Sequence, residues 1–581
     1  MINPSLCRAS SQLAIAETEP VPRYMTWLLC LVCVAVLFVN LGRVNFFEPD
    51  EGRNAEKARE IILLNDWVTP HENFLPVLDK PMSFYWLVAF SYKIFGIAEW
   101  SARLPSTMFA LGCLILVYRF SMRWWGAWAA MWSVLILLTN VEFFLLARIV
   151  IFDTTLTFCV TLALCSFYSA LHAENEKTKK IYCLLLYGAL ATGTLVKGLI
   201  GLVIPGMVGF VYLLIKNQWA SLRRLYIIPG TLLCVVIIGA WYLWADARNP
   251  GYLRYYLWDE HLTRYLTDDF NRENPWFYFF MVMAAGYSPW TLFLPFVGRY
   301  LWQERDDKNI FLALWVALPF LFFSFSSSKL PQYLLPVYPP LALLSGQTLA
   351  HLFNELEPKK RRLWYLPCVF VASFVFFLFM GSFWQRLLPL PIRDVVDQNF
   401  LFVGLTALAL ILTYIGFGCV YRRKHRQSQS AAYLCTTVVM ALFFLLVSCL
   451  MITVSFERSA KALARSAAPF IQHDSRIFVY DTYINGLLFY LGLDRPILIV
   501  SSPIKSTVMG SPYVSMHRPR ATPRYGQILF NFDEFLTAWR ETQHLPLVFA
   551  KAKNVPRLEG QLGGPTKELA RAGEHVLLSR P

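Results

Sequence analysis

The chain has 581 residues, of which 56% are hydrophobic, 16% aromatic and 16% charged, and its mean hydropathy is +0.45. A soluble protein of this length needs more polar surface, so the composition indicates an integral membrane protein. The net charge of +15 does not indicate binding to nucleic acid, because the basic residues form short clusters between apolar runs. The 12 cysteines do not indicate a disulfide framework, because all of them except Cys7 lie in apolar runs.

The N-terminal residues 1–23 are polar, and we predict a cytoplasmic tail there. The first apolar run, Tyr24–Arg43, is not followed by a small-residue cleavage site, so we expect a retained membrane anchor and not a signal peptide. A helix needs roughly 20 residues to cross about 30 Å of hydrocarbon. Apolar runs of interest begin near residues 24, 82, 102, 124, 154, 181, 200, 225, 276, 309, 333, 363, 399 and 431.

Basic clusters between these runs predict the topology. Consecutive clusters are separated by two runs each, so by the positive-inside rule all of them face the cytoplasm. Asp50 then lies outside, and only an odd number of crossings can connect it to the first cluster. We therefore expect the short run Met82–Gly96 to lie in the outer interface or to re-enter. The clusters are Arg119 and Arg123; Lys177, Lys179 and Lys180; Lys216, Arg223 and Arg224; Arg299, Arg305 and Lys308; Lys359, Lys360, Arg361 and Arg362; and Arg422, Arg423, Lys424 and Arg426.

The topology leaves about 13 crossings and an external C-terminus. The predicted fold is a polytopic α-helical membrane protein, with a transmembrane domain at residues 24–455 and outer loops at 44–101 and 246–275. Residues 456–581 alternate between strand and helix patterns, which predicts a small extracytoplasmic α/β domain. Its expected helices are Lys461–Ile471, Tyr483–Leu491 and Asp533–Glu541, and its expected strands are Arg476–Tyr480, Ile497–Val500, Leu547–Ala550 and Val576–Ser579.

Charged residues from separate segments fall on the outer side, although a charge at a membrane end is more often an anchor than a functional group. Asp50 and Glu51 open a predicted helix, Glu51–Leu64, with Ala55, Ala58 and Ile62 on one face. The two carboxylates either complement the helix dipole or point into an outer cavity, which the non-crossing segment would cover. The other outer charges are Arg53, Asp79, Lys80, Arg148, Asp153, Lys197, Arg248, Arg254, Asp259, Glu260, His261, Arg264 and Lys329.

Three of the outer basic residues have both a structural and a functional interpretation. Lys80 is either a snorkelling lysine with Asp79 as its counter-ion or a point charge for a phosphate. Arg148 either closes a helix end together with Asp153 or leaves that acid to the site. Lys197, which precedes Gly198 in a predicted tight turn, either marks the end of its helix or points to the same cavity.

Two outer loops supply further candidates. In the polar loop Tyr252–Asn274, Arg264 offers a planar fork for phosphate oxygens. His261 is either an ordinary satisfied polar group or, together with Asp79, a ligand of a divalent metal. Lys329 and Tyr333 either donate to an anionic group or belong to an interfacial belt of tyrosine and lysine.

The sequence contains no Walker, GxSxG or HExxH pattern, which argues against nucleotide chemistry. An activated substrate on the outer side must then arrive on a lipid. The segments PDEGRNAEKAREIILLNDWVTP (49–70) and LDKPMSFYWL (78–87) resemble the first outer loop of the bacterial type C glycosyltransferases related to protein O-mannosyltransferases. Further segments resemble that family in its order: ARLPS (102–106), ARIVIFDTTLTF (147–158), LVKGLIGLVIPG (195–206), EHLTRYLT (260–267), NPWFYFF (274–280) and SSKLPQYLLPVYPPLALL (327–344).

The resemblance implies a type C glycosyltransferase fold and a site. It implies that Asp50 is the first-loop acid and that Asp153 is the acid of the second outer loop, and we add Glu51 to the predicted catalytic set. It implies a metal pair of Asp79 and His261, although the residue before the lysine is more usually Glu in the family. Gly52 also departs from the family, which tends to have a small or polar residue there. The predicted donor-phosphate group is Lys80, Arg264, Tyr333, Lys329 and Arg53.

Among these relatives are enzymes that move 4-amino-4-deoxy-L-arabinose from undecaprenyl phosphate to lipid A. The resemblance therefore implies such a transferase, a polymyxin-resistance enzyme of the inner membrane. It would face the periplasm, act as a monomer and require no cofactor, although the Asp79 and His261 pair could hold a divalent metal such as zinc. An acceptor on protein or on another glycan is the first alternative, and the sugar stays open. A transporter is the second alternative, but we find no internal repeat and few charges at the apolar centres.

Overall fold

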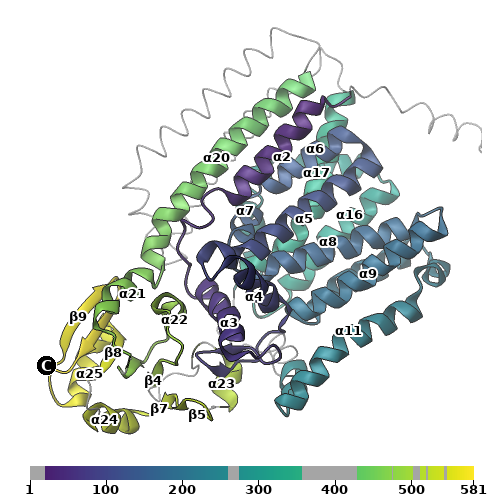
Figure 1. The fold of residues 1–581 in the computed structure, drawn as a ribbon. Helices are drawn as coiled ribbons and strands as arrows, with labels where there is room; N and C mark the ends of the chain where they lie inside the picture. The colour runs from purple at the N-terminus through teal and green to yellow at the C-terminus, as the bar shows by residue number, and fades with distance from the viewer. Residues whose placement is uncertain are drawn as a thin grey trace, which may run out of the picture.

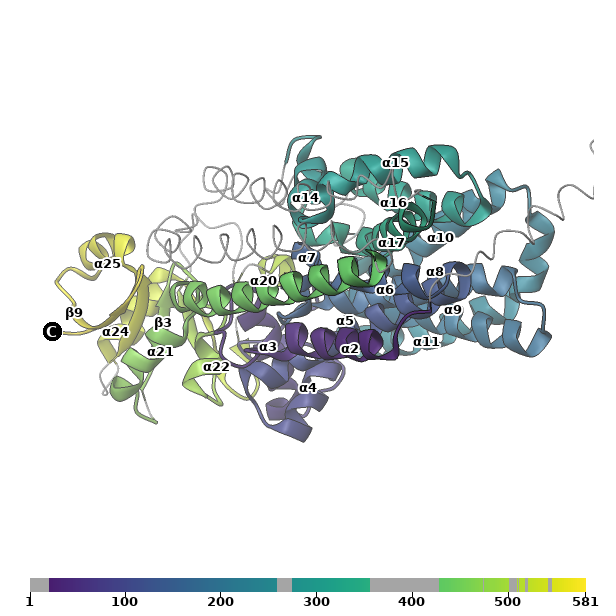
Figure 2. The ribbon, with the colours of Figure 1, turned by 90° about the horizontal axis from the view of Figure 1, so that it is seen from above.

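The computed structural model describes residues 20–258, 274–355, 428–473, 475–500, 509, 511–517, 521–541 and 546–581. Within these residues the chain forms a body of packed helices and a small α/β domain at its C-terminal end (Figure 1). The long helix α20 connects the two parts and lies beside α2, and a second view shows the same arrangement (Figure 2). Both predicted parts of the chain are therefore present.

The helices of the body follow the predicted apolar runs, and the runs near residues 363 and 399 lie outside the described residues. Among the described residues, five helices are long and apolar enough to cross a membrane, or up to seven if each of two bent pairs is one span. The helices are α2 (Arg23–Phe38), α3 (Asp50–Leu64), α4 (Ser83–Phe95), α5 (Glu99–Trp125), α6 (Ala127–Leu138), α7 (Val141–Ala147), α8 (Phe152–Leu171), α9 (Glu176–Lys197), α10 (Ile200–Ile215), η1 (Trp219–Leu225), α11 (Ile227–Arg248), α12 (Tyr252–Arg254), α14 (Tyr278–Gly286), η3 (Trp290–Phe293), α15 (Leu294–Gln303), α16 (Asp307–Ser324), η4 (Pro331–Val337), α17 (Tyr338–Glu355) and α20 (Ser428–Arg458).

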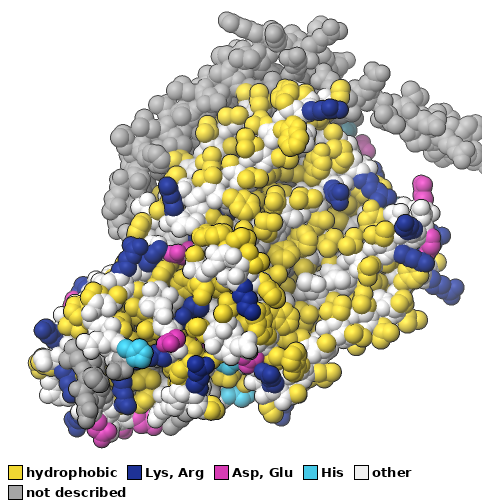
Figure 3. Space-filling model, viewed as in Figure 1, with side chains coloured by type: hydrophobic (Ala, Val, Ile, Leu, Met, Phe, Trp, Pro, Cys, Tyr) yellow, Lys and Arg dark blue, Asp and Glu magenta, His cyan; other side chains and the backbone are white. Residues whose placement is uncertain are grey.

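The surface of the body fits a multi-pass membrane protein. Hydrophobic side chains cover most of its visible face, while charged side chains gather at its ends and on the C-terminal domain (Figure 3). Helix α4 has 13 residues, about 20 Å at 1.5 Å per residue, which is too short to cross the bilayer. Its Phe90, Ile94 and Phe95 side chains are exposed. This geometry fits the expected position in the outer interface.

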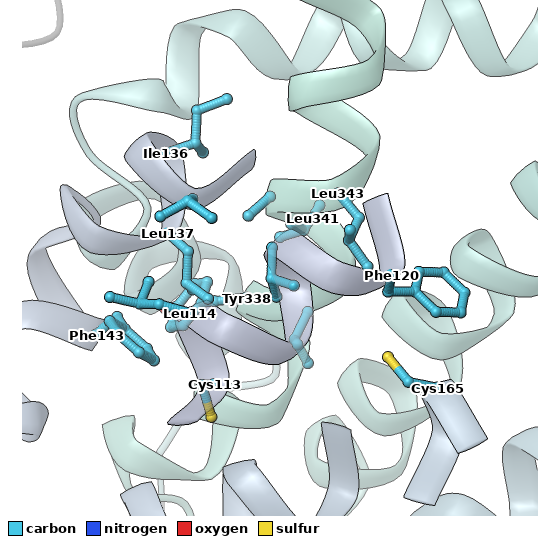
Figure 4. Packing of buried hydrophobic residues seen from close by; sticks show 14 of the residues in the cluster. Cys113, Leu114, Phe120, Ile136, Leu137, Phe143, Cys165, Tyr338, Leu341 and Leu343 are labelled. Atoms are coloured by element: carbon cyan, nitrogen blue, oxygen red, sulfur yellow. The ribbon is translucent and has the colours of Figure 1, made fainter. Parts of the chain in front are cut away.

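The interior of the body is a close contact between α6 and α17. Leu137 of α6 and Leu341 of α17 belong to one buried cluster around Tyr338 (Figure 4). At Gly346 an added Cβ would lie 2.5 Å from the backbone nitrogen of Ser133, so only glycine permits this approach of the two helices. The contact holds the outer start of α17 in a fixed place.

The C-terminal domain is built on a mixed sheet with the strand order β7-β4-β3-β8-β10-β9. Strands β7, β4, β3 and β8 are parallel, whereas β10 is antiparallel to both of its neighbours. Strand β3 is fully buried and β8 is buried except at Lys551, and the two form the centre, as expected for parallel strands covered on both faces. The elements are α21 (Lys461–Ala467), η5 (Ala468–Phe470), β3 (Ile477–Tyr480), α22 (Leu487–Leu491), β4 (Leu498–Val500), α23 (Pro512–His517), β5 (Ala521–Thr522), β6 (Gly526–Gln527), β7 (Leu529–Phe530), α24 (Phe532–Glu541), β8 (Leu547–Lys551), η6 (Ala552–Asn554), α25 (Val555–Leu562), β9 (Lys567–Ala572) and β10 (His575–Ser579).

The predicted helix Tyr483–Leu491 is shorter in the structure, where α22 begins at Leu487. The residues before it make contacts outside the C-terminal domain. The Asn485 side chain donates to Glu72 Oε1 at 2.8 Å, and Gly486 packs against the Glu48 side chain. These contacts belong to the interface with the helical body. Strand β9 was not predicted, because it is an edge strand with no buried residue and with three charged residues, Lys567, Glu568 and Arg571.

Helix α3 is polar in sequence and buried in the structure, between the helical body and the C-terminal domain (Figure 1). Its polar groups are therefore paired. Arg59 donates to Glu56 and, at 2.6 Å, to the carbonyl of Leu493 in the C-terminal domain. Lys57 lies 3.4 Å from Glu72, which belongs to the small hairpin of β1 (His71–Glu72) and β2 (Leu75–Pro76). The predicted helix is confirmed, but its polar side is not solvated.

The same hairpin binds the C-terminal domain directly. Asn73, at the turn with φ +54°, donates to the Ile497 carbonyl at 2.7 Å and accepts from the Ile497 N–H at 2.8 Å. Phe46 N donates to the Tyr490 hydroxyl at 2.8 Å. Because these partners are far apart in sequence, the domain and the first outer loop form one folded unit.

A buried ion pair fixes the start of α3. Arg103 of α5 is 0% exposed, and its guanidinium donates to both carboxylate oxygens of Glu51 at 2.8 Å. The same guanidinium donates to the carbonyls of Leu41, Val44 and Asn45, which follow α2. A bidentate charged pair with its remaining donors satisfied is strong in a dry interior. This pair therefore joins α2, α3 and α5.

We expect the substitution Arg103→Met to unfold this junction, because it leaves the Glu51 carboxylate buried with no cation. Breaking a buried pair in this way costs about 3–5 kcal/mol. The measurement is thermal unfolding of the purified protein in detergent. Arg571→Met is the matched control, since Arg571 forms an exposed pair with Glu568 on β9; it should change the stability by less than about 1 kcal/mol. Equal melting temperatures for the two variants would contradict the central role of the pair.

Candidate functional site

The candidate site lies at the end of the body that faces the C-terminal domain. The N-termini of α3, α8 and α17, the C-terminus of α9 and the segment before α4 all reach this end (Figure 1). They carry most of the residues that the sequence selected for the outer side. The predicted convergence of distant segments is therefore present among the described residues.

Asp153 is the acid at the centre of this convergence. It lies in the first turn of α8, is 1% exposed and forms an ion pair with Lys197, the last residue of α9. Asp50 and Lys80 both act electrostatically on its carboxylate. Its Oδ2 atom has no hydrogen-bond partner among the described residues. The acid thus keeps one free oxygen in a buried, mixed-charge environment.

Lys197 connects this acid to η4. Its Nζ atom lies 4.6 Å from the centre of the Tyr333 ring and 5.5 Å from that of Phe152. Gly198, at φ +91°, ends α9, which confirms the predicted tight turn. Asp153, Lys197 and Tyr333 therefore form one group from three separate elements.

Asp50 and Glu51 are neighbours with opposite environments. Asp50 begins α3 and its side chain is exposed, on a helix that is otherwise largely buried. Glu51 is 1% exposed, and besides Arg103 it accepts from the N–H groups of Phe47 and Val150. Its carboxylate is therefore fully used inside the protein, which favours a structural role for Glu51 over the predicted catalytic one.

Arg53 and Asp79 lie at the boundary with the C-terminal domain. The Arg53 side chain is 21% exposed; its Nε lies 3.4 Å from Glu72, and its Nη2 donates to the Met509 carbonyl at 3.1 Å. Asp79 Oδ1 accepts from the Tyr255 hydroxyl at 3.0 Å and from Tyr513 N at 3.2 Å. Both predicted residues therefore meet the segment around α23 as well as the outer loop.

The remaining predicted residues are placed in different ways. Arg264 and His261 lie outside the described residues. Lys329 is 8% exposed, and its carbonyl accepts from Asn274 Nδ2 at 3.3 Å. No group of three or more His, Cys, Asp or Glu side chains that could hold a metal occurs within the described ranges. Asp79 is the one member of the predicted metal pair whose surroundings are known.

Three buried polar residues beside this cluster, Lys57, Glu72 and Glu142, were not predicted from the sequence. Lys57 and Glu72 are paired, but their partnership depends on the fold of the hairpin and leaves no local pattern. Glu142, at the start of α7, accepts a hydrogen bond from the Tyr338 hydroxyl. Glu142 and Tyr333 both interact electrostatically with Tyr278. A signal for Glu142 did exist, because it is a single acid inside an apolar run.

The structure shows which of the two interpretations of Arg148 holds. Its guanidinium donates to the carbonyls of Val36, Leu37 and Val39 at 2.5–2.8 Å. It therefore closes a helix end, as in the structural interpretation, but the helix is α2 and its partner is not Asp153. The acid is left to Lys197.

The chain is similar in sequence to known glycosyltransferases. Residues 79–244 match the family model of the dolichyl-phosphate-mannose-protein mannosyltransferases. An undecaprenyl phosphate-α-4-amino-4-deoxy-L-arabinose arabinosyl transferase of Pseudomonas paraeruginosa is 31% identical over 340 residues, 58% of this chain and 61% of that protein. The protein of the same name from Aeromonas hydrophila is 31% identical over 334 residues, 57% of this chain and 60% of that protein. The matched region thus spans about three-fifths of these relatives.

Solved structures extend the likeness to the whole chain. The crystal structure of ArnT from Cupriavidus metallidurans bound to undecaprenyl phosphate has a TM-score of 0.80 at 23% identity, over 95% of this chain and 97% of that one. The archaeal oligosaccharyltransferase AglB from Archaeoglobus fulgidus has a TM-score of 0.50 at 10% identity, over 93% and 71%. At these identities the likeness is one of fold. The predicted fold class is confirmed: this chain has the fold seen in ArnT, and its residues 79–244 match the mannosyltransferase family model.

Proposed function

We propose that this chain is a membrane glycosyltransferase that moves a sugar from undecaprenyl phosphate to a phosphate of lipid A. The sugar is 4-amino-4-deoxy-L-arabinose or a related amino sugar, and the anomeric configuration inverts. The names of the similar transferases support the donor and the sugar. The reaction takes place at the periplasmic face of the bacterial inner membrane, as the charge distribution of the loops favours.

One observation carries the proposal: the acids and cations that converge at one end of the helical body. Asp153 is paired with Lys197 and lies within the electrostatic reach of Asp50 and Lys80, and Lys197 lies over Tyr333. Such a group at a membrane boundary suits substrates whose reactive heads lie there and whose tails lie in lipid. A transporter would instead place its charges near the bilayer midplane.

The proposed chemistry breaks the bond between the anomeric carbon and the phosphate oxygen of the donor. Undecaprenyl phosphate leaves, and negative charge grows on its phosphate in the transition state. Lys80, Tyr333 and Arg264 stabilise that charge, with Lys329 and Arg53 nearby, which is the kind of electrostatic effect that usually contributes most to catalysis. The acceptor attacks from the opposite face, so the configuration inverts.

The proposed role of Asp50 depends on the acceptor. A lipid A phosphate is already ionised and needs no general base, so Asp50 orients the acceptor or a sugar hydroxyl. With a hydroxyl acceptor, on protein or another glycan, the same carboxylate would take the proton. Its exposed position at the start of a buried helix suits either role, because the substrate can reach it while α3 holds it still.

Three further points complete the proposal. Asp153 keeps Lys197 in place and supplies a carboxylate oxygen to the site. The reaction needs no metal, although Asp79 and His261 are the pair that would bind a divalent ion such as zinc. The protein acts as a monomer, with the C-terminal domain on the periplasmic side, where lipid A is presented.

We expect Asp50→Asn to abolish sugar transfer in cells, because the amide keeps the size of the side chain and removes its charge. The measurement is mass spectrometry of lipid A from a strain that makes the undecaprenyl-linked sugar, with and without the wild-type chain. The wild type should add one sugar mass to a lipid A phosphate, and the mass identifies the sugar. Glu574→Asn, an exposed acid of the C-terminal domain paired with Lys551, is the control and should act as the wild type.

Two outcomes would contradict this proposal. If lipid A is unchanged although the wild-type protein and the donor are present, the acceptor is a protein or another glycan. If Asp50→Asn modifies lipid A as well as the wild type does, the reaction does not depend on this acid.

We expect Lys80→Ala to lower kcat/KM for the undecaprenyl-linked donor by about 10²–10³-fold, the usual loss when one donor to a developing charge is removed. Lys93→Ala is the matched control in the same loop, because Lys93 is exposed and its Nζ atom lies over the Trp67 ring, 4.5 Å from its centre. The assay uses both purified variants and extracted lipid A. A loss of equal size in both variants would assign the effect to the loop as a whole.

A further inference from the structure

Glu48 is a buried acid that the proposed chemistry does not use. It stands two residues before Asp50, and both of its carboxylate oxygens are buried without a hydrogen-bond partner among the described residues. Its backbone N–H donates to the carbonyl of Arg458, at the end of α20, at 3.1 Å. A buried carboxyl group without partners is costly, so this position requires an explanation.

Two glycines surround this carboxyl group, one from each part of the protein. A Cβ added at Gly486, in the C-terminal domain, would lie 1.9 Å from Glu48 Oε1. A Cβ added at Gly52, in the first turn of α3, would lie 2.5 Å from the same oxygen. The two glycines also lie close to each other, since a Cβ added at Gly52 would lie 2.7 Å from the Gly486 Cα. The Glu48 carboxyl group therefore fills the contact between α3 and the domain.

The charges that face Glu48 do not provide a spare cation. Glu51 and Glu72 are acids, and each is already paired, with Arg103 and with Lys57 respectively. Within the part of the chain that the structure describes, Arg53 is the base that acts on Glu48, and Arg53 is shared with Glu72. Burial, with the two neighbouring acids, raises the pKa of Glu48 from its usual 4.5 to about 8, against the opposing effect of the Gly486 backbone and Arg53. At pH 7 the group is neutral and can stay in the contact.

We propose that Glu48 is a positioning residue for the glycosyl transfer: its neutral carboxyl group seats the C-terminal domain on the first turn of α3 and so holds Asp50 in place. The inference rests on the proposed function for its effect on catalysis. An ionised Glu48 needs water or a cation, which the contact with Gly52 and Gly486 does not admit. The charged form therefore separates α3 from the domain, and Asp50, in the same turn as Gly52, moves with it.

The direction of the pH effect follows from the raised pKa. Below the unfolded value of about 4.5 Glu48 is protonated in both the folded and the unfolded chain, and the contact is fully stabilised. As the pH rises towards 8, the unfolded chain releases this proton and the folded chain retains it, so stability falls. Above about 8 the seated form is lost.

The test compares the wild type with Glu48→Gln, Glu48→Ala and the control Glu574→Gln, using purified full-length protein, donor and lipid A. Glutamine has the shape of the neutral acid. Glu48→Gln should keep at least half of the activity at pH 7 and lose the decline that the wild type shows near pH 8. Glu48→Ala should lower kcat at least 10-fold, with the KM for the donor unchanged within 2-fold.

A second measurement does not need activity. Hydrogen exchange of residues 486–493, compared with the base-catalysed intrinsic rate at each pH, should be protected at pH 7 and unprotected at pH 9 in the wild type, and protected at both pH values in Glu48→Gln. Gly486→Ala should exchange fast at both, because the added methyl group expels the Glu48 side chain. If the wild type transfers no sugar but shows this exchange pattern, the proposed function fails and the seating of the domain stands.

Two results would overturn the inference. The first is an alkaline decline of the same size and midpoint in the wild type and in Glu48→Gln. The second is a Glu48→Ala variant with the activity and exchange of the wild type, which would show that the carboxyl group seats nothing.

Discussion

The buried pair of Arg103 and Glu51 is the interaction on which the end of the helical body beside the C-terminal domain depends. Arg103 reaches Glu51 with both arms of its fork and also binds the carbonyls that follow α2. Arg148 binds the last carbonyls of α2 itself. Carbonyl groups at a helix end have no partners within the helix, and inside a membrane protein they have little access to water. The two arginines supply the donors, and the chain can then turn into α3 without leaving polar groups unpaired.

A consequence of this anchoring is that a polar helix can be buried. Helix α3 lies between the helical body and the C-terminal domain, and its charges find partners on both sides: Glu51 in α5, Lys57 in the hairpin and Arg59 in the domain. Each pair is far apart in sequence or bridges two parts of the fold. The helix is therefore held from both sides, and its first residue, Asp50, is the charged group that the fold leaves exposed beside Asp153.

The general architecture could be predicted from the sequence because its signals are local. Apolar runs and basic clusters report on the membrane directly, and the helices from α2 to α20 begin close to the predicted residues wherever the structure describes them. The central strands of the C-terminal domain were also predictable, since β3 and β8 are short, apolar and buried. Helix α25 and strand β9 were missed, because both are polar and exposed.

The candidate site was predictable in position but not in detail. The positions of the charges along the sequence predicted that Asp50, Lys80, Asp153 and Tyr333 lie at one end of the protein. The local sequence of residues 48–53, however, does not show that the adjacent acids Asp50 and Glu51 have different environments. Glu51 differs from Asp50 because Arg103 lies 52 residues away in the sequence and beside it in the fold. Lys57 resembles a lysine on a solvated helix face until the hairpin brings Glu72 against it. The roles of such residues are set by partners that only the folded chain provides.

Three acids within four residues thus have three different environments. The Glu48 carboxyl group is buried without a hydrogen-bond partner among the described residues, Asp50 is exposed, and Glu51 is buried in a complete ion pair. Separate environments allow neighbouring carboxyl groups to take separate roles. The ion-paired acid ties α3 to the helical body, the neutral acid lies against the C-terminal domain, and the exposed acid between them is left to the substrate. Because the two buried acids act on either side of Asp50, a movement of either part of the protein must displace it.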